Sequence, residues 1–254
     1  MIIHTGMRTD IPAFYSEWFL HRIQEGMVCV RNPYNPSQVT KYRLSPEVVD
    51  LIAFCTKNPA PMLSHMDALK PYGQYWFVTI TPYGRDIEPN VPDKEIVMEH
   101  FKQLSKLVGL DSVGWRYDPI LVDPVHSVNW HISQFEKMAR TLCDYTKTCV
   151  ISFIDLYKKV QKNFPEARSA AKEERMTIGK AFIEIAYKYW IINSGECHYK
   201  FTIEVNDRFK IFKLPYRLQS GIVIKQGYKT TFPIDKTTIF SGLNEITAYG
   251  KLIV

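Results

Sequence analysis

Short apolar runs that end in polar residues occur five times in the chain up to Lys159. The runs are I-I-H-T-G-M-R-T-D-I-P, L-I-A-F-C-T-K-N-P-A-P, Y-W-F-V-T-I-T-P-Y-G-R-D, V-G-W-R-Y-D-P-I and C-V-I-S-F-I-D-L-Y-K-K. Segments with helical periodicity lie between them, and strands that alternate with helices predict a parallel β/α sheet. In such folds, ligands bind at the carboxyl ends of the strands. The repetition therefore predicts where a site lies before it indicates any chemistry.

The predicted fold class is α/β, and the 254 residues suffice for about one β/α barrel. Strands are expected near 1–5, 51–55, 75–80, 112–116 and 148–153, and helices near 12–25, 59–69, 93–108, 127–142 and 170–189. The runs M-V-C-V-R and V-T-K-Y-R flank the turn residues N-P-Y-N-P-S, which predicts an inserted β-hairpin. Because only five or six β/α units are legible, we expect a partial TIM-barrel-like parallel sheet.

The character of the sequence changes after residue 191. We therefore expect a β/α-barrel-like domain over 1–191 and a divergent, β-rich C-terminal segment over 192–254, in which F-T-I-E-V and G-I-V-I-K alternate like strands. From Tyr199 onward there are nine Lys or Arg against four Asp or Glu, whereas residues 1–198 hold 23 basic and 22 acidic residues. The basic residues of the tail are dispersed, which disfavours nucleic-acid binding.

Other classes of protein are disfavoured by simple patterns. The apolar runs fall short of the roughly 20 residues of a membrane span, and no signal peptide is visible at the N-terminus. The five cysteines form no C-x-x-C pair; they are Cys29, Cys55, Cys143, Cys149 and Cys197. Such spacing favours a cytoplasmic protein with reduced thiols over a disulfide framework or a zinc ribbon.

The polar residues at the predicted strand ends are the candidate ligand-binding set. They are Arg8, Asp10, Lys57, Asn58, Thr81, Tyr83, Arg116, Asp118, Ser152 and Asp155. Four of them, Asp10, Asn58, Thr81 and Asp118, stand one or two residues before a proline, and each by itself is typical of a helix cap or turn.

Capping does not explain the cations Arg8, Lys57 and Arg116. Two interpretations remain open. In one, the arginines and aspartates form an internal network that holds the loops. In the other, the cations and the helix N-termini form a pocket for a phosphate or carboxylate.

Metal binding and thiol chemistry receive weaker support from the sequence. His4 lies within the first strand, while His126 and His131 are five residues apart and do not share a helix face. There is no H-E-x-x-H and no tight cluster of metal ligands, so we predict no metal site. Lys57 stands two residues after Cys55 and would favour its thiolate, but burial as a small apolar residue is the commoner role.

Several long motifs resemble a bacterial family known only as domain of unknown function 1848. They are R-T-D-I-P-A-F-Y-S-E-W-F, V-R-N-P-Y-N-P, L-S-P-E-V-V-D, T-K-N-P-A-P-M, T-P-Y-G-R-D-I-E-P-N-V-P, W-R-Y-D-P-I and C-V-I-S-F-I-D-L-Y-K-K. The resemblance extends from residue 1 to about residue 191. The resemblance implies a barrel-like core, distantly similar to radical S-adenosylmethionine proteins such as spore photoproduct lyase. It implies as matching strand-end positions Arg8, Thr9, Asp10, Lys57, Asn58, Arg116, Asp118, Ser152 and Asp155, without assigned catalytic roles.

The chain departs from this family in two respects. Members usually carry Trp where this chain has Cys55. They also end in a C-x3-C-x2-C motif, which would hold a [4Fe–4S] cluster that acts with S-adenosylmethionine. This chain lacks the motif, so we predict no cofactor for it. Either a shifted reading frame near residue 190 or a natively divergent end accounts for the tail.

We therefore expect a cytoplasmic barrel that binds a small anionic ligand, such as a phosphate, carboxylate or nucleotide, at its strand ends. One alternative is a binding or regulatory barrel with no chemistry of its own. Another is a divalent-metal hydrolase built around His4 and the aspartates. The patterns assign neither a catalytic residue nor an oligomeric state.

Overall fold

The computed structural model describes residues 1–6, 8–192, 202–206 and 222–225. These residues belong to two compact units. The first contains residues 1–78 and 99–113, and the second contains residues 79–98 and the described residues from 114 onward.

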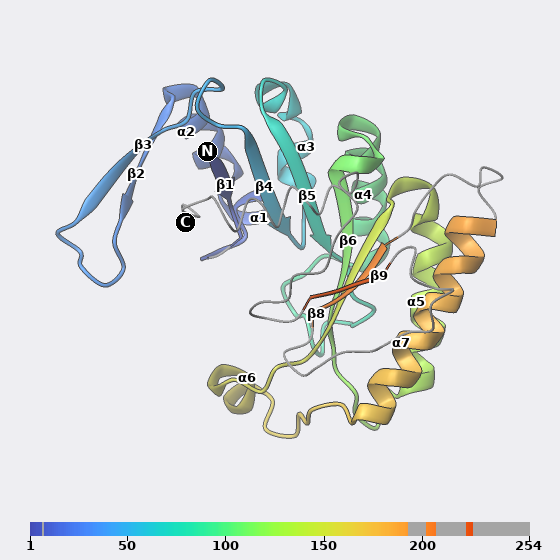
Figure 1. Ribbon diagram of the computed structural model, residues 1–254. Helices are drawn as coiled ribbons and strands as arrows, with labels where there is room; N and C mark the ends of the chain where they lie inside the picture. The colour runs from blue at the N-terminus through green and yellow to red at the C-terminus, as the bar shows by residue number, and fades with distance from the viewer. Residues whose placement is uncertain (7, 193–201, 207–221, 226–254) are drawn as a thin grey trace. The chain divides into compact units, whose positions relative to one another are not determined.

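In the first unit, strand β4 lies between β1 and β5, and all three run parallel. Their bounds are β1 (Ile2–His4), β4 (Leu51–Thr56) and β5 (Gly73–Thr79), of which Thr79 already belongs to the second unit. The helices are α1 (Ile11–Phe14), α2 (Ser16–Glu25), α3 (Ala60–Leu63), η1 (Met66–Leu69), the later part of α4 (Lys94–Val108) and η2 (Leu110–Ser112). Figure 1 shows the parallel strands and the helices beside them.

Alternation along β4 explains the core of the first unit. Ile52 and Phe54 are fully buried, and the ring of Phe54 stacks on Trp76 with centroids 3.9 Å apart. Phe19 of α2 meets the same ring edge-on at 5.7 Å. Successive strand residues point to opposite faces, so the large rings at even positions pack on the helices while Ala53 and Cys55 face the other way.

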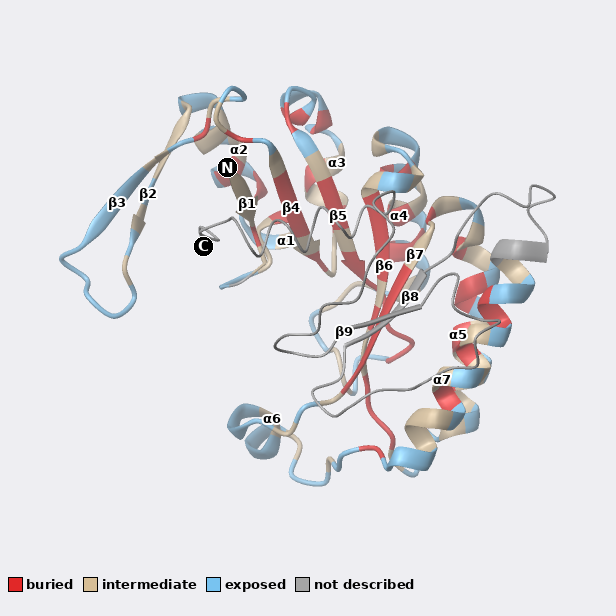
Figure 2. Cartoon of the chain, viewed as in Figure 1, coloured by how far each residue is buried: buried red, intermediate tan, exposed pale blue. Residues whose placement is uncertain are grey.

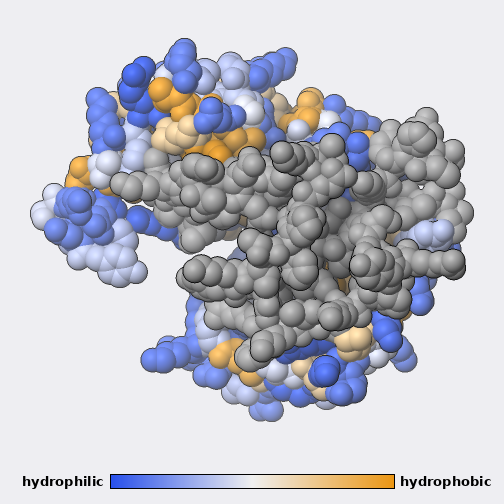
Figure 3. Space-filling view, in the orientation of Figure 1, coloured by the Kyte–Doolittle hydropathy of each residue, from blue (hydrophilic) through white to orange (hydrophobic). Residues whose placement is uncertain are grey.

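The inserted hairpin is confirmed. β2 (Met27–Arg31) and β3 (Val39–Arg43) pair antiparallel, and Gly26 ends α2 in the left-handed conformation that glycine adopts without strain. Most of the hairpin is exposed (Figure 2), and its far end is hydrophilic (Figure 3).

In the second unit, strands β6, β7, β8 and β9 pair parallel in that order. Their bounds are β6 (Val113–Ile120), of which Val113 belongs to the first unit, β7 (Thr148–Phe153), β8 (Thr202–Asn206) and β9 (Ile222–Lys225). The helices are α5 (Val128–Leu142), η3 (Cys143–Tyr145), α6 (Lys158–Asn163), α7 (Lys172–Ala186) and the π-helical turn η4 (Tyr187–Ile192).

Aromatic rings form the core of the second unit. Phe135 of α5 and Phe182 of α7 stack with centroids 3.7 Å apart, and Tyr117 of β6 meets Phe182 edge-on at 5.3 Å. All three side chains are fully buried. The stack therefore fastens two helices to each other and to the strand that carries Tyr117.

The predicted α/β class with parallel strands is confirmed, and so are the two strands expected in the tail. Three element predictions were wrong in detail. The helix expected over 12–25 breaks at Tyr15, whose φ of −135° is not helical, and the helix expected over 59–69 is two short turns. The strand expected to end at 116 continues to Ile120.

Closure into a barrel and the division at residue 191 stay predictions, and most of 192–254 lies outside the described residues. Among the described residues, the structure contains no helix with the length and hydropathy of a membrane span.

Candidate functional site

Asp10 joins the ends of two neighbouring strands in the first unit. Its Oδ1 accepts a hydrogen bond from the backbone N–H of Ala13 at 3.0 Å and caps α1. Its Oδ2 accepts from the backbone N–H of Lys57, just past β4, at 2.7 Å. The capping role expected for Asp10 is therefore confirmed. The same carboxylate also links the loop after β1 to the loop after β4 by a hydrogen bond.

The same contact brings other predicted residues together. Arg8 and Thr9 precede Asp10 and are exposed, while Lys57 and Asn58 are half-buried. Arg8 forms no ion pair with any other described residue. The Asn58 side-chain oxygen accepts from the N–H of Ala60 at 3.2 Å, as a turn former does.

His4 and Cys55 meet at this edge of the sheet, a contact that the sequence did not predict. His4 Nε2 lies 3.5 Å from Cys55 Sγ, and the backbone N–H of Gly6 donates to His4 Nδ1 at 3.3 Å. The parallel register pairs His4 with Ala53, so Cys55 lies two residues further along on the same face. Only the register of the two strands reveals this neighbourhood.

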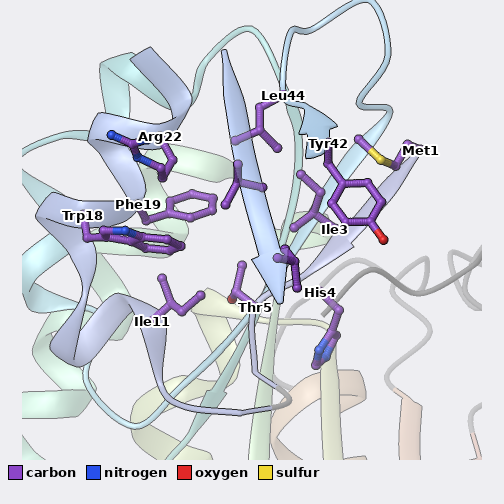
Figure 4. A pocket seen from close by; sticks show the side chains of 12 residues that line it. Met1, Ile3, His4, Thr5, Ile11, Trp18, Phe19, Arg22, Tyr42 and Leu44 are labelled. Carbon is purple, nitrogen blue, oxygen red and sulfur yellow. The ribbon is translucent and has the colours of Figure 1, made fainter. Parts of the chain in front are cut away.

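An apolar cavity of about 80 Å³ lies in the first unit between β1, α2 and the β2–β3 hairpin. In Figure 4 the rings of Trp18 and Phe19 face the strands from one side of the cavity. Thr5 and Ile11, which flank the loop that carries Arg8, also line it. A cavity of about 150 Å³ binds benzene, which has six carbon atoms. A cavity of about half that volume therefore admits a few methylene groups.

In the second unit, Arg116 and Asp118 lie within β6 rather than past its end, which corrects their expected position. Strand residues two apart share a face, so their side chains form an ion pair. The Ser152 hydroxyl of β7 donates to the other oxygen of Asp118. This geometry favours the internal-network interpretation for Arg116.

Thr81 and Tyr83 are buried beside β6. The Thr81 hydroxyl donates to Glu88 at 2.6 Å. The Tyr83 hydroxyl donates to the carbonyl of Pro119 and accepts from the N–H of Leu121, both at 2.8 Å. Burial raises the pKa of Tyr83 well above its usual value. Both side chains hold loops, and a ligand contact at either one stays a prediction, as it does for the exposed Asp155 after β7.

A histidine pair in the second unit was not part of the predicted site. His131 Nε2 faces the carbonyl of Leu121 at 2.8 Å, and the Tyr117 hydroxyl lies 2.9 Å from His131 Nδ1. Burial lowers the pKa of His131 to about 4, so the ring is neutral at neutral pH. His126 Nδ1 lies 3.0 Å from Asp123; burial opposes ionisation of that carboxyl, but hydrogen bonds from His126 lower its pKa. The contacts of these histidines come from a loop and a strand, so the sequence gives no signal for a partner of either ring.

The described residues do not fit a metal cluster. They contain no group of three or more His, Cys, Asp or Glu side chains that could hold a metal ion. Four cysteines with free thiols are described, and the sequence lacks the three-cysteine motif of a [4Fe–4S] site.

Comparison with known proteins gives a family. The model of the family described as "Domain of unknown function (DUF1848)" matches residues 2–208. The chain belongs to this family. Membership confirms the resemblance seen in the motifs, and the match extends it past residue 191. It brings no assigned activity.

No curated protein matches the chain. Among solved structures, the chain is similar to spore photoproduct lyase complexed with dinucleoside spore photoproduct, with 11% sequence identity and a TM-score of 0.47. The similarity covers 75% of this chain and 58% of that one, so the chain spans less than two thirds of its length.

Proposed function

We propose that the chain binds a small anionic ligand at the carboxyl ends of β1 and β4, with Arg8 as the principal cation. The hydrogen bonds of the Asp10 carboxylate support this proposal best. Both of its oxygens accept from backbone amides, at 3.0 Å from Ala13 and 2.7 Å from Lys57. Asp10 therefore fixes the loop and leaves Arg8 exposed without a carboxylate partner among the described residues.

The chemistry of this edge suits an oxyanion. A guanidinium presents several N–H donors in a planar fork that matches phosphate and carboxylate. The exposed Thr9 supplies a hydroxyl donor next in sequence. Arg116 differs, because its ion pair with Asp118 already occupies it.

The neighbouring cavity suggests the rest of the ligand. Because Thr5 and Ile11 bound both the cavity and the loop of Arg8, an anion at Arg8 could extend a short apolar group into it. The apolar lining favours an aliphatic group. We therefore expect an alkyl phosphate or carboxylate to bind more tightly than the bare anion.

Isothermal titration with inorganic phosphate at low ionic strength tests the proposal. Arg8→Ala is expected to weaken binding at least about tenfold, since a charge-assisted contact is worth about 1.5–3 kcal/mol. Arg116→Ala and the exposed-hairpin control Arg31→Ala should leave affinity unchanged. Equal affinity for wild type and Arg8→Ala, or no binding at all, would overturn the proposal. Titration with n-butyl phosphate then tests whether an alkyl group that enters the cavity makes binding tighter than that of inorganic phosphate.

We propose that the chain binds this anion in the cytoplasm. Radical chemistry of the kind that the resemblance implies for relatives would need cluster ligands, and this sequence lacks their motif.

A further inference from the structure

The contact between His4 and Cys55 has the polarity needed to favour a thiolate. The N–H of Gly6 donates to His4 Nδ1, so that nitrogen carries a lone pair. In a neutral imidazole the proton then resides on Nε2, and this nitrogen faces Cys55 Sγ at 3.5 Å. A donor aimed at sulfur stabilises the charged form of the thiol more than the neutral form.

The backbone around the pair is arranged for this contact. A Cβ on Gly6 would lie 2.4 Å from the Cβ of Cys55, so only glycine allows the loop to approach so closely. That approach brings the Gly6 N–H to His4 and fixes the orientation of the ring. Figure 4 shows the imidazole directed away from Trp18 and Phe19, consistent with the face that the strand register gives to Cys55.

The other described cysteines have different surroundings. Cys149 is fully buried, and burial raises the pKa of its thiol well above the usual value. Burial, with the carboxylate of Asp144, also raises the pKa of Cys143. Cys29 is exposed on β2. Cys55 is half-buried, at strand ends that also carry Lys57.

We propose that Cys55 is a reactive thiol, paired with His4, that undergoes exchange with low-molecular-weight disulfides. The thiol loses its proton to solvent, and the thiolate attacks one sulfur of the disulfide. A bond forms between Cys55 Sγ and that sulfur while the original sulfur–sulfur bond breaks, and the second half leaves as a thiolate. The small disulfide is the oxidant, and the product is a mixed disulfide on Cys55. This site is independent of the anion proposed at Arg8.

Site-resolved mass spectrometry of the full chain tests this inference. The protein is treated with glutathione disulfide at neutral pH, and the modification rate of each cysteine is followed. Cys55 should react several times faster than Cys29, although Cys29 is the more exposed. His4→Leu should slow Cys55 about fivefold or more and shift its pH–rate profile to higher pH, because the donor is lost, while Cys29 keeps its rate.

His4→Gln serves as the conservative variant, since its amide can donate to sulfur in place of Nε2, and it should retain part of the rate. A wild-type Cys55 that reacts more slowly than Cys29 would overturn the inference, even if the variants fail to fold. An unchanged Cys55 rate and pH profile in folded His4→Leu would overturn it as well.

Discussion

At the scale of single residues, the hydrogen bonds of Asp10 carry a clear stability prediction. Asp10→Ala removes a helix cap, typically worth about 1 kcal/mol, and also leaves the N–H of Lys57 without its acceptor. We expect unfolding in urea to show a loss of about 1–3 kcal/mol. Asp10→Asn, which keeps one acceptor oxygen, should lose less. A change below about 0.5 kcal/mol in Asp10→Ala would show that the link between the loops is not stabilising.

His131 carries a prediction about pH. Its pKa falls from 6.5 to about 4 on folding. Between these two pH values, His131 is therefore protonated in the unfolded chain and neutral in the folded chain. The stability that His131 contributes is present above pH 6.5 and is lost as pH falls toward 4, by up to about 3 kcal/mol.

Denaturant unfolding of wild type and His131→Gln at pH 7.5 and pH 4.5 measures this difference. The glutamine does not titrate, and its amide can replace the contacts to Leu121 and Tyr117. The variant should lose less stability than wild type between the two pH values. Equal losses would mean that other groups carry the pH dependence.

Residue roles were only partly predictable from sequence. The proline two positions after Asp10 marked it correctly as a cap, because capping is a local property. Whether Arg8 or Arg116 was already paired depended on which residues faced them. For Arg116, pairing with an aspartate was one of the two interpretations left open, and the extension of β6 to Ile120, which places Asp118 on the same face, favours it. The contact of His4 with Cys55 depended on strand register, which the sequence alone does not fix.

At the scale of elements, the aromatic stack between α5 and α7 should dominate the stability of the second unit. Phe182→Ala removes a fully buried ring that stacks on Phe135 at 3.7 Å. We expect a cost of about 3–5 kcal/mol in chemical denaturation. The matched control Phe14→Ala, on a side chain that is 68% exposed, should stay within about 0.5 kcal/mol. Similar costs for the two variants would contradict the burial described here.

Elements with strong periodicity were predicted well, whereas short ones were not. The helices near 93–108 and 127–142 formed almost as expected, because their apolar residues recur at helical spacing over four turns. The single helix expected over 59–69 became two short turns, since propensity alone does not hold so short a helix. Residue 15 gave no proline or glycine signal for the break between α1 and α2.

At the scale of the whole molecule, family membership and cysteine content lead to a prediction about iron. The chain belongs to the DUF1848 family but lacks the three-cysteine motif expected from the resemblance. After anaerobic reconstitution with iron and sulfide, we expect a colourless protein with far less than the four iron atoms of a [4Fe–4S] cluster. A brown protein holding about four iron atoms per chain would show that other residues supply the ligands.

The parallel α/β class was predictable because five apolar strands each carry a visible signal. The division into two compact units was not predicted, since no composition change marks residue 79 or residue 114. The boundary expected at residue 191 rested on composition alone and stays a prediction.

Whether an anion binds at Arg8 is best tested by a crystal structure of the protein soaked with tungstate, whose anomalous signal locates the anion. We predict a peak within hydrogen-bond distance of the Arg8 guanidinium and the Thr9 hydroxyl, at the carboxyl ends of β1 and β4. Density that instead shows Arg8 paired with a carboxylate, with tungstate bound elsewhere, would contradict it.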